Sequence, residues 1–111
     1  MLDKAAVRDL AARYAREVRK ILSPDAILIF GSQVNGNPTE YSDIDIAIIC
    51  NNFEGDWYET TIALSKLARD FSFDIEPHLL DENFDDSGFV EHILKTGEYI
   101  FEAGDRGIGQ K

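Results

Sequence analysis

Two short apolar runs, separated by a loop rich in glycine, asparagine and proline, most constrain what this chain can fold into. The first run is AILIF, Ala26–Phe30, and the second is DIDIAIIC, Asp43–Cys50. Each is too short for a buried helix and rich in branched side chains, so both are predicted to be buried strands. The residues between them, Gly31–Ser42, favour turns and positive φ angles. Beyond its acidic start, the second strand is apolar on both sides and is expected to be covered on both faces.

The rest of the sequence alternates between helical and extended patterns. Apolar residues at spacings of three and four predict helices over Asp3–Leu22, Asp56–Phe71 and Ser87–Thr96. Residues Phe71–Leu80 alternate as a third strand, and 98–104 can add a last extended piece. The order predicts an α/β fold in which a small mixed sheet, with one antiparallel and one parallel pairing, is packed by helices.

Length, charge and cysteine content limit the class of protein. The 111 residues are enough for one domain, expected over 1–104, and residues 105–111 are expected to form a flexible tail. The net charge of -10, from 21 acidic and 11 basic residues, argues against direct nucleic-acid binding by this chain alone. No apolar run reaches the roughly 20 residues of a membrane span, and the N-terminus lacks a secretory pattern, so a cytoplasmic protein is expected. The single cysteine, Cys50, excludes an internal disulfide and is expected to be a buried, inert thiol.

Acidic residues from separate parts of the sequence are expected to meet at one end of the sheet. The helix between the second and third strands makes those strands parallel, so Asp74 should lie beside Asp43 and Asp45. The first and second strands lack a full helix between them, which favours an antiparallel pair and brings Gly31 and Ser32 to the same end. Gly31 would let the backbone approach a phosphate closely, while Ser32 and the following N–H groups could donate hydrogen bonds to it.

This arrangement has the donors of a two-metal phosphoryl-transfer site. Asp43 and Asp45 share one face of a strand about 6.5 to 7 Å apart, so their side chains can bridge metal ions between them. A third carboxylate would complete the shell of one ion. Asp74 is preferred for that role because it is nearer the strand start, and Glu76, on the same face, is the alternate third carboxylate.

At these residues the sequence resembles a known family. Gly31-Ser32, followed after ten residues by Asp43-Ile44-Asp45 and an apolar strand, is similar to the signature of the polymerase-beta-like nucleotidyltransferase superfamily. The likeness is greatest to minimal, single-domain nucleotidyltransferases, the group that includes MNT antitoxins paired with HEPN toxins. It covers 26–80 clearly and the flanking helices loosely. The resemblance implies a nucleotidyltransferase fold in which Gly31 and Ser32 hold the nucleotide triphosphate.

The resemblance also implies an activity. Asp43, Asp45 and Asp74 would be catalytic residues and would bind Mg²⁺, with two ions present when nucleotide is bound. The reaction would transfer a nucleoside monophosphate from an NTP, ATP in the first instance, to an acceptor hydroxyl. Larger members of the superfamily bind the acceptor with a second domain, which this sequence does not show. The favoured acceptor is therefore a side chain of a partner protein such as a HEPN-type toxin. Transfer to a small molecule such as an aminoglycoside is a weaker hypothesis. Homo-oligomer formation is the alternative kind of association.

One departure from the family pattern supports a different class of function. Many antitoxin-type members carry an arginine shortly after the Gly-Ser pair, where this chain has QVNGN, residues 33–37. Stabilisation of triphosphate charge would then rest on metals, backbone donors or a group from a partner. The alternative is therefore a catalytically weak or inactive antitoxin-like module that neutralises a partner by covering it.

Two further patterns are interpreted without a catalytic role. His78 and His92 are expected to be surface or half-buried polar residues, since their separation does not match a transition-metal motif, although His78 shares the face of Asp74. Phosphatases of the haloacid dehalogenase type also use a D-x-D motif. They need it at the finish of an apolar strand, whereas here Asp43 and Asp45 precede one.

Overall fold

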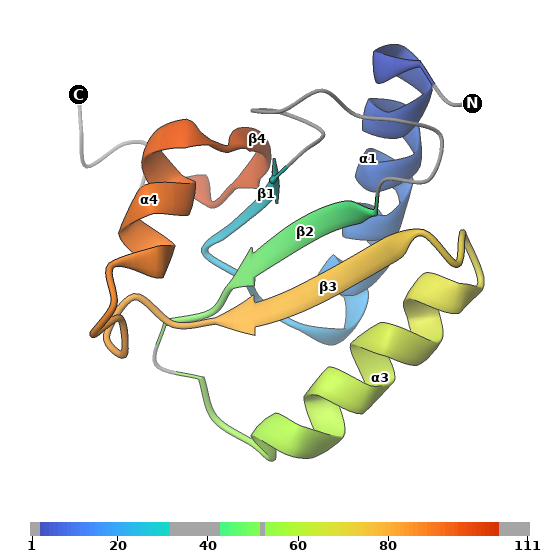
Figure 1. Cartoon of the computed structure of the whole chain (residues 1–111). Helices are drawn as coiled ribbons and strands as arrows, with labels where there is room; N and C mark the ends of the chain where they lie inside the picture. The colour runs from blue at the N-terminus through green and yellow to red at the C-terminus, as the bar shows by residue number, and fades with distance from the viewer. Residues whose placement is uncertain (1–2, 32–42, 52, 105–111) are drawn as a thin grey trace.

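The computed structural model describes residues 3–31, 43–51 and 53–104 of the chain. Its elements are α1 (Lys4–Ile21), β1 (Ala26–Phe30), β2 (Ile44–Ile49), α3 (Trp57–Arg69), β3 (Ile75–Leu80), α4 (Phe89–Thr96) and β4 (Glu98–Glu102), as drawn in Figure 1. The type and order of the predicted helices and strands are confirmed. The predicted tail over 105–111 lies outside the described residues.

Four strands form one mixed sheet in the order β3-β2-β1-β4. β2 is antiparallel to β1 and parallel to β3, so the predicted antiparallel and parallel pairings are both confirmed. β4 adds a second antiparallel pairing, on the other edge of β1. The C-terminal extended piece thus covers an edge whose N–H and C=O groups would otherwise lack a neighbouring strand.

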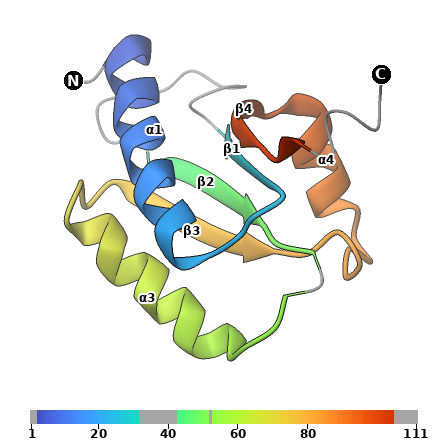
Figure 2. The same cartoon turned by 180° about the vertical axis from the view of Figure 1, so that it is seen from behind.

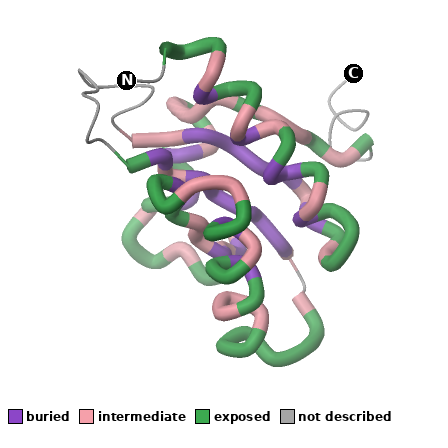
Figure 3. The backbone as a smooth tube through the Cα atoms, turned by 90° about the vertical axis from the view of Figure 1, so that its right-hand side faces the viewer, coloured by how far each residue is buried: buried purple, intermediate pink, exposed green. Residues whose placement is uncertain are grey.

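Helices cover both faces of this sheet. α1 and α3 lie on one face and α4 lies on the other (Figures 1 and 2). The alternation along β2 follows this division, because Ile44, Ile46 and Ile48 pack beneath α1 and α3 while Ala47 and Ile49 pack beneath α4. The prediction that this strand is covered on both faces is confirmed, and β1 and β2 are the most buried part of the sheet (Figure 3).

Local sequence signals explain where the two long helices begin and how they are joined. The carboxylate of Asp3 accepts a hydrogen bond from the Ala6 N–H at 2.7 Å, and that of Asp56 accepts one from the Glu59 N–H at 2.9 Å. Both are N-caps that satisfy amide groups left free by the first helical turn. The buried hydroxyl of Tyr14 donates to the carbonyl of Leu64 at 2.8 Å and links α1 to α3.

The third strand starts later than its alternating pattern predicts. Residues Phe71 and Ser72 continue the end of α3, since their N–H groups both donate to the Ala68 carbonyl at 2.9 Å. Phe73 lies before the strand and is 81% exposed. β3 therefore begins at Ile75, and Asp74 precedes the strand.

The structure also bears on the predictions about membranes and thiol chemistry. Within the described ranges, no helix combines the length and apolar character needed to cross a bilayer. Cys50 is a free, buried cysteine, as predicted.

Candidate active site

The turn after β1 lies directly against an aspartate of β2. Phe30 is opposite Asp45 in the antiparallel register, so the next residue, Gly31, faces the start of β2. Gly31 has a φ of 82°, and a Cβ built there would lie 2.6 Å from Asp45 Oδ2. Both the left-handed backbone and the close approach require glycine. The predicted meeting of the glycine turn with the D-x-D motif is confirmed for Gly31.

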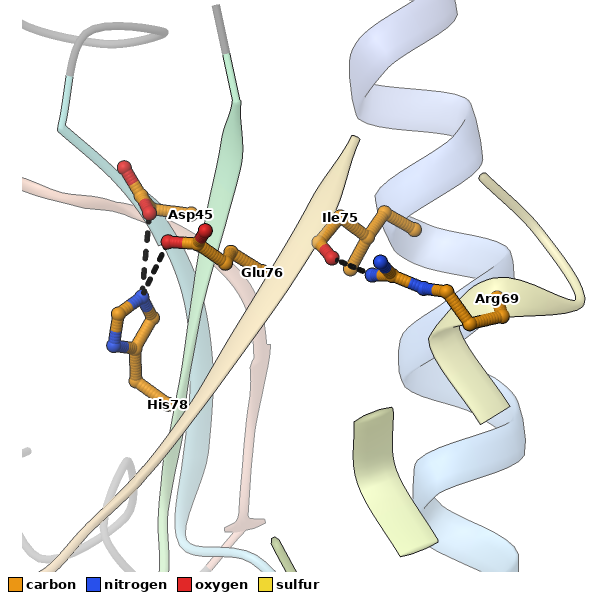
Figure 4. A network of polar contacts seen from close by, with 5 residues as sticks. All are labelled: Asp45, Arg69, Ile75, Glu76 and His78. Atoms are coloured by element: carbon orange, nitrogen blue, oxygen red, sulfur yellow. Dashed lines mark hydrogen bonds and ion pairs between the residues drawn. The ribbon is translucent and has the colours of Figure 1, made fainter. Parts of the chain in front are cut away.

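Asp45, Glu76 and His78 form a cluster on neighbouring strands. Asp45 is level with Glu76 in the parallel register of β2 and β3, and His78 follows two residues later on the same face. His78 Nε2 lies 3.2 Å from Asp45 Oδ1 and 3.9 Å from Glu76 Oε1. The three side chains point toward one another (Figure 4), and one potential ligand atom from each lies within 4.8 Å of the other two. The three side chains could therefore bind a single metal ion.

The other two predicted acids stand one step nearer the start of these strands. Asp43 and Asp74 are both exposed and each precedes its strand by one residue. The Ile44 N–H donates to the Asp74 carbonyl at 2.8 Å, which continues the pairing of β2 with β3 back to this point. Along the backbone, Asp43 and Asp74 therefore lie just before the paired residues of β2 and β3, in which Asp45 is level with Glu76.

The start of β3 is held by a residue of α3. The Arg69 guanidinium donates to the carbonyl of Ile75 (Figure 4) and lies 5.6 Å from the centre of the Phe73 ring. This contact connects the end of α3 to the first residue of β3.

Aromatic rings support the histidine of the cluster. Phe30 packs edge-on against His78, with 5.1 Å between ring centres, and against Phe89 of α4, with 5.7 Å. The His78 side chain is 32% exposed, in agreement with the expected half-buried histidine. Its closeness to Asp45 was not predicted. The sequence did indicate that His78 and Glu76, two residues apart, share one face of the strand. Whether that face brings His78 near Asp45 depends on the register of β3 against β2.

Ser32, predicted to bind the nucleotide triphosphate, lies outside the described residues, as does most of the loop up to Ser42. The geometry on the nucleotide side therefore rests on Gly31. On the metal side, the cluster contains two of the predicted acids, Asp45 and Glu76, and does not include Asp43 or Asp74.

The family of the chain follows from its sequence match. Residues 14–106 match the family described as polymerase beta, nucleotidyltransferase. The chain belongs to this nucleotidyltransferase family. The match includes every element that contributes to the acidic cluster, and it confirms the resemblance expected from the Gly-Ser and D-x-D spacing. No curated protein matches the chain significantly.

Solved structures support the nucleotidyltransferase fold. A candidate nucleotidyltransferase from Sulfolobus solfataricus is 23% identical, with a TM-score of 0.58 over 75% of this chain and 74% of that one. A second match is a chain in the complex of tri-AMPylated Shewanella oneidensis HEPN toxin with MNT antitoxin. It is 20% identical, with a TM-score of 0.60 over 90% of this chain and 76% of that one. A toxin–antitoxin structure with AMP-PNP is 21% identical, with a TM-score of 0.62 over 86% and 76%. At these identities the likeness shows the shared fold.

Proposed function

We propose that this chain is a Mg²⁺-dependent nucleotidyltransferase that transfers a nucleoside monophosphate from an NTP, in the first instance ATP, to an acceptor hydroxyl. The bond between the α- and β-phosphates breaks and pyrophosphate is released. The observation that carries the proposal is the position of Asp45. Its carboxylate lies against the glycine turn after β1 and 3.2 Å from His78 Nε2, and a carboxylate oxygen of Glu76 lies within 4.8 Å of it. Asp45 therefore lies between a turn that can approach a phosphate and side chains that can bind a cation. Metal-dependent transfer from a nucleotide requires these two features side by side.

The carboxylates fit divalent cations. Asp45 in β2 and Glu76 in β3 present hard oxygen ligands side by side, and Asp43 and Asp74, each one residue before its strand, offer more oxygens. We assign Glu76 as the third carboxylate because it is level with Asp45, and Asp74 remains the alternative because it stands beside Asp43. Bound Mg²⁺ ions would neutralise triphosphate charge and lower the pKa of the attacking hydroxyl.

The nucleotide would enter from the glycine turn. Gly31 leaves room beside Asp45 because it has no side chain, and its backbone is already in the left-handed conformation. We propose that Gly31, together with Ser32, binds the triphosphate, as the family resemblance implies. The inward packing of β2 holds Asp45 in place during binding, since Ile44 and Ile46 on either side of it are fully buried.

The proposed acceptor is a hydroxyl on a partner protein, with a HEPN-type toxin as the first candidate. The Shewanella complex, whose fold this chain shares, pairs an MNT antitoxin with a tri-AMPylated HEPN toxin. The net charge of -10 favours a partner with a basic surface. Homo-oligomer formation is the alternative association.

Label transfer tests the activity directly. The pure chain is incubated with α-labelled ATP, Mg²⁺ and a HEPN-type partner, and labelled partner is measured. The Asp45→Asn variant is expected to lose roughly 100-fold or more of the rate, because an amide replaces a shared metal ligand. Asp9→Asn, an exposed acid on α1, is the matched control and should keep the parent rate. Absence of transfer by the parent chain, or equal rates in Asp45→Asn and the parent, would refute the proposal.

A second candidate is neutralisation of a partner by covering it. The absence of arginine in residues 33–37 favours this function. An Asp43→Asn, Asp45→Asn double variant separates the two candidates. If that variant neutralises the partner as well as the parent chain does, covering is the function, and if neutralisation fails while the complex still forms, transfer is.

A further inference from the structure

We propose that His78 is a metal ligand alongside Asp45 and Glu76, and that this mixed nitrogen and oxygen site selects Mn²⁺ over Mg²⁺. The inference deepens the proposed function and rests on it for the position of the ion. The imidazole would give one of the two cation positions a preference for Mn²⁺ that carboxylates alone would not have.

The distances suit ligands of one ion. Two ligand atoms about 2.1 Å from a shared ion are about 3 Å apart at right angles and about 4.2 Å apart on opposite sides. His78 Nε2 is 3.2 Å from Asp45 Oδ1 and 3.9 Å from Glu76 Oε1. Both separations fall within this interval. An ion could therefore replace the histidine–aspartate contact with little movement of either side chain.

The imidazole is held in a pose that directs Nε2 at the carboxylates. The edge of Phe30 packs against the ring, and the backbone of His78 belongs to β3, which pairs with β2 along its length. The nitrogen faces Asp45 and Glu76 across the two strands (Figure 4). A ligand on a paired strand and supported by a neighbouring ring is already organised for binding before an ion arrives.

The donor set decides which cation is favoured. Mg²⁺ is bound mainly by oxygen and keeps several waters, so an imidazole adds little to its binding. First-row transition ions accept imidazole readily, and Mn²⁺ also accepts carboxylates. Two carboxylates and one imidazole therefore raise affinity for Mn²⁺ relative to Mg²⁺. Asp43 and Asp74, which are exposed, offer carboxylate oxygens for the second ion.

The test is electron spin echo envelope modulation of Mn²⁺ bound to the full chain, which detects nitrogen coordinated to the metal. The chain has two histidines, so His92→Gln leaves His78 as its single imidazole. We expect a ¹⁴N signal in this variant that changes to a ¹⁵N signal after labelling with ¹⁵N-histidine. A bound Mn²⁺ without a histidine nitrogen signal would overturn the inference, whether or not a His78 variant folds.

A second measurement separates a ligand from a residue that only positions Asp45. His78→Gln keeps an N–H donor for Asp45 but removes the imidazole. We expect its Mn²⁺ affinity to fall about 10-fold or more while its Mg²⁺ affinity changes by less than about 3-fold. Equal losses for both ions would mean that His78 acts through Asp45. Circular dichroism compares the folding of the variants.

These readouts need neither nucleotide nor acceptor. A chain that binds Mn²⁺ through His78 but transfers no label would contradict the proposed function alone. A chain that transfers label without nitrogen coordination of Mn²⁺ would contradict the present inference alone.

Discussion

Gly31 and Gly88 adopt nearly the same left-handed backbone, with φ values of 82° and 80°, but only Gly31 has a close neighbour at the position of a Cβ. A Cβ at Gly31 would meet Asp45 Oδ2, whereas a Cβ at Gly88 would meet nothing within 4 Å. The pair therefore separates the cost of the backbone conformation from the cost of disturbing the site.

We expect Gly31→Ala and Gly88→Ala each to lower the free energy of unfolding by roughly 1–2 kcal/mol, the cost of a left-handed conformation. Gly31→Ala should in addition weaken Mn²⁺ binding about 10-fold or more, because it pushes the Asp45 carboxylate aside. Urea unfolding and Mn²⁺ titration measure the two effects. Equal metal affinity in both variants would show that the close approach is not part of the site.

Single substitutions can also decide whether Glu76 or Asp74 is the third carboxylate. Glu76→Gln is expected to reduce label transfer roughly 100-fold, and Asp74→Asn less than about 10-fold, because only Glu76 is level with Asp45. Both substitutions keep the size of the side chain. The Asp74 carbonyl that accepts from Ile44 belongs to the backbone and is unaffected. The opposite ranking of rates would restore Asp74 to the role that the sequence first suggested.

At the scale of elements, α4 and β4 meet at a residue with no spare room. A Cβ on Gly97 would lie 2.8 Å from the Ile93 carbonyl oxygen and 3.0 Å from that of Ile29. Both are backbone atoms, so α4 or β1 would have to shift. Gly97→Ala should lower the free energy of unfolding by about 1–3 kcal/mol. Gly104→Ala, where nothing lies within 4 Å, is the control, and equal midpoints in urea would contradict this account.

The contact between α1 and α3 gives a second prediction for the elements. Tyr14→Phe removes the hydroxyl that donates to the Leu64 carbonyl but keeps the ring against Phe71, whose centre lies 5.9 Å away. We expect the free energy of unfolding, measured in urea, to fall by about 1 kcal/mol and the rate of label transfer to stay the same. Tyr58→Phe, at a tyrosine that is 71% exposed, should stay within about 0.5 kcal/mol of the parent. A large fall in activity would mean that α1 acts on the site.

At the scale of the whole molecule, buried ionisable groups predict how stability responds to alkali. Burial, with the nearby carboxylates of Asp25 and Asp81, raises the pKa of the Cys50 thiol from 9.0 to about 11. The folded chain therefore keeps the thiol neutral while the unfolded chain ionises it. The stabilisation is fully present below pH 9 and is lost as the pH rises toward 11. Burial also raises the pKa of Tyr14, which extends the loss to higher pH.

We therefore expect the urea midpoint to fall between pH 9 and 11, and to fall less steeply in Cys50→Ala. The control is the same pair of proteins between pH 6.5 and 8, where the thiol is neutral in both states and the two slopes should match. Native Cys50 should also react slowly with thiol reagents at pH 8 because it is neutral and buried. Parallel curves for parent and variant across pH 9 to 11 would contradict the assignment.

Much of the fold was accessible from the sequence because its signals are local. Branched apolar runs marked β1 and β2, and the alternation along β2 assigned its two faces correctly. The helix that joins β2 to β3 made those strands parallel, and the short β1–β2 connection made the other pair antiparallel. These rules also brought Gly31 to Asp45. The pairing of β4 with β1 was not predicted, since no local pattern specifies which edge a last strand joins.

The sequence by itself determined which end of the sheet carries the acids, because the direction of each strand follows from the connection that precedes it. Only the tertiary structure decided which acid of β3 stands beside Asp45. Asp74 and Glu76 share one strand face, so alternation cannot separate them, although they are about 6.5 to 7 Å apart along the strand. The choice depends on the extra turn after α3, on the start of β3 at Ile75, and on the register that places Glu76 level with Asp45. The same register brings His78 to the cluster.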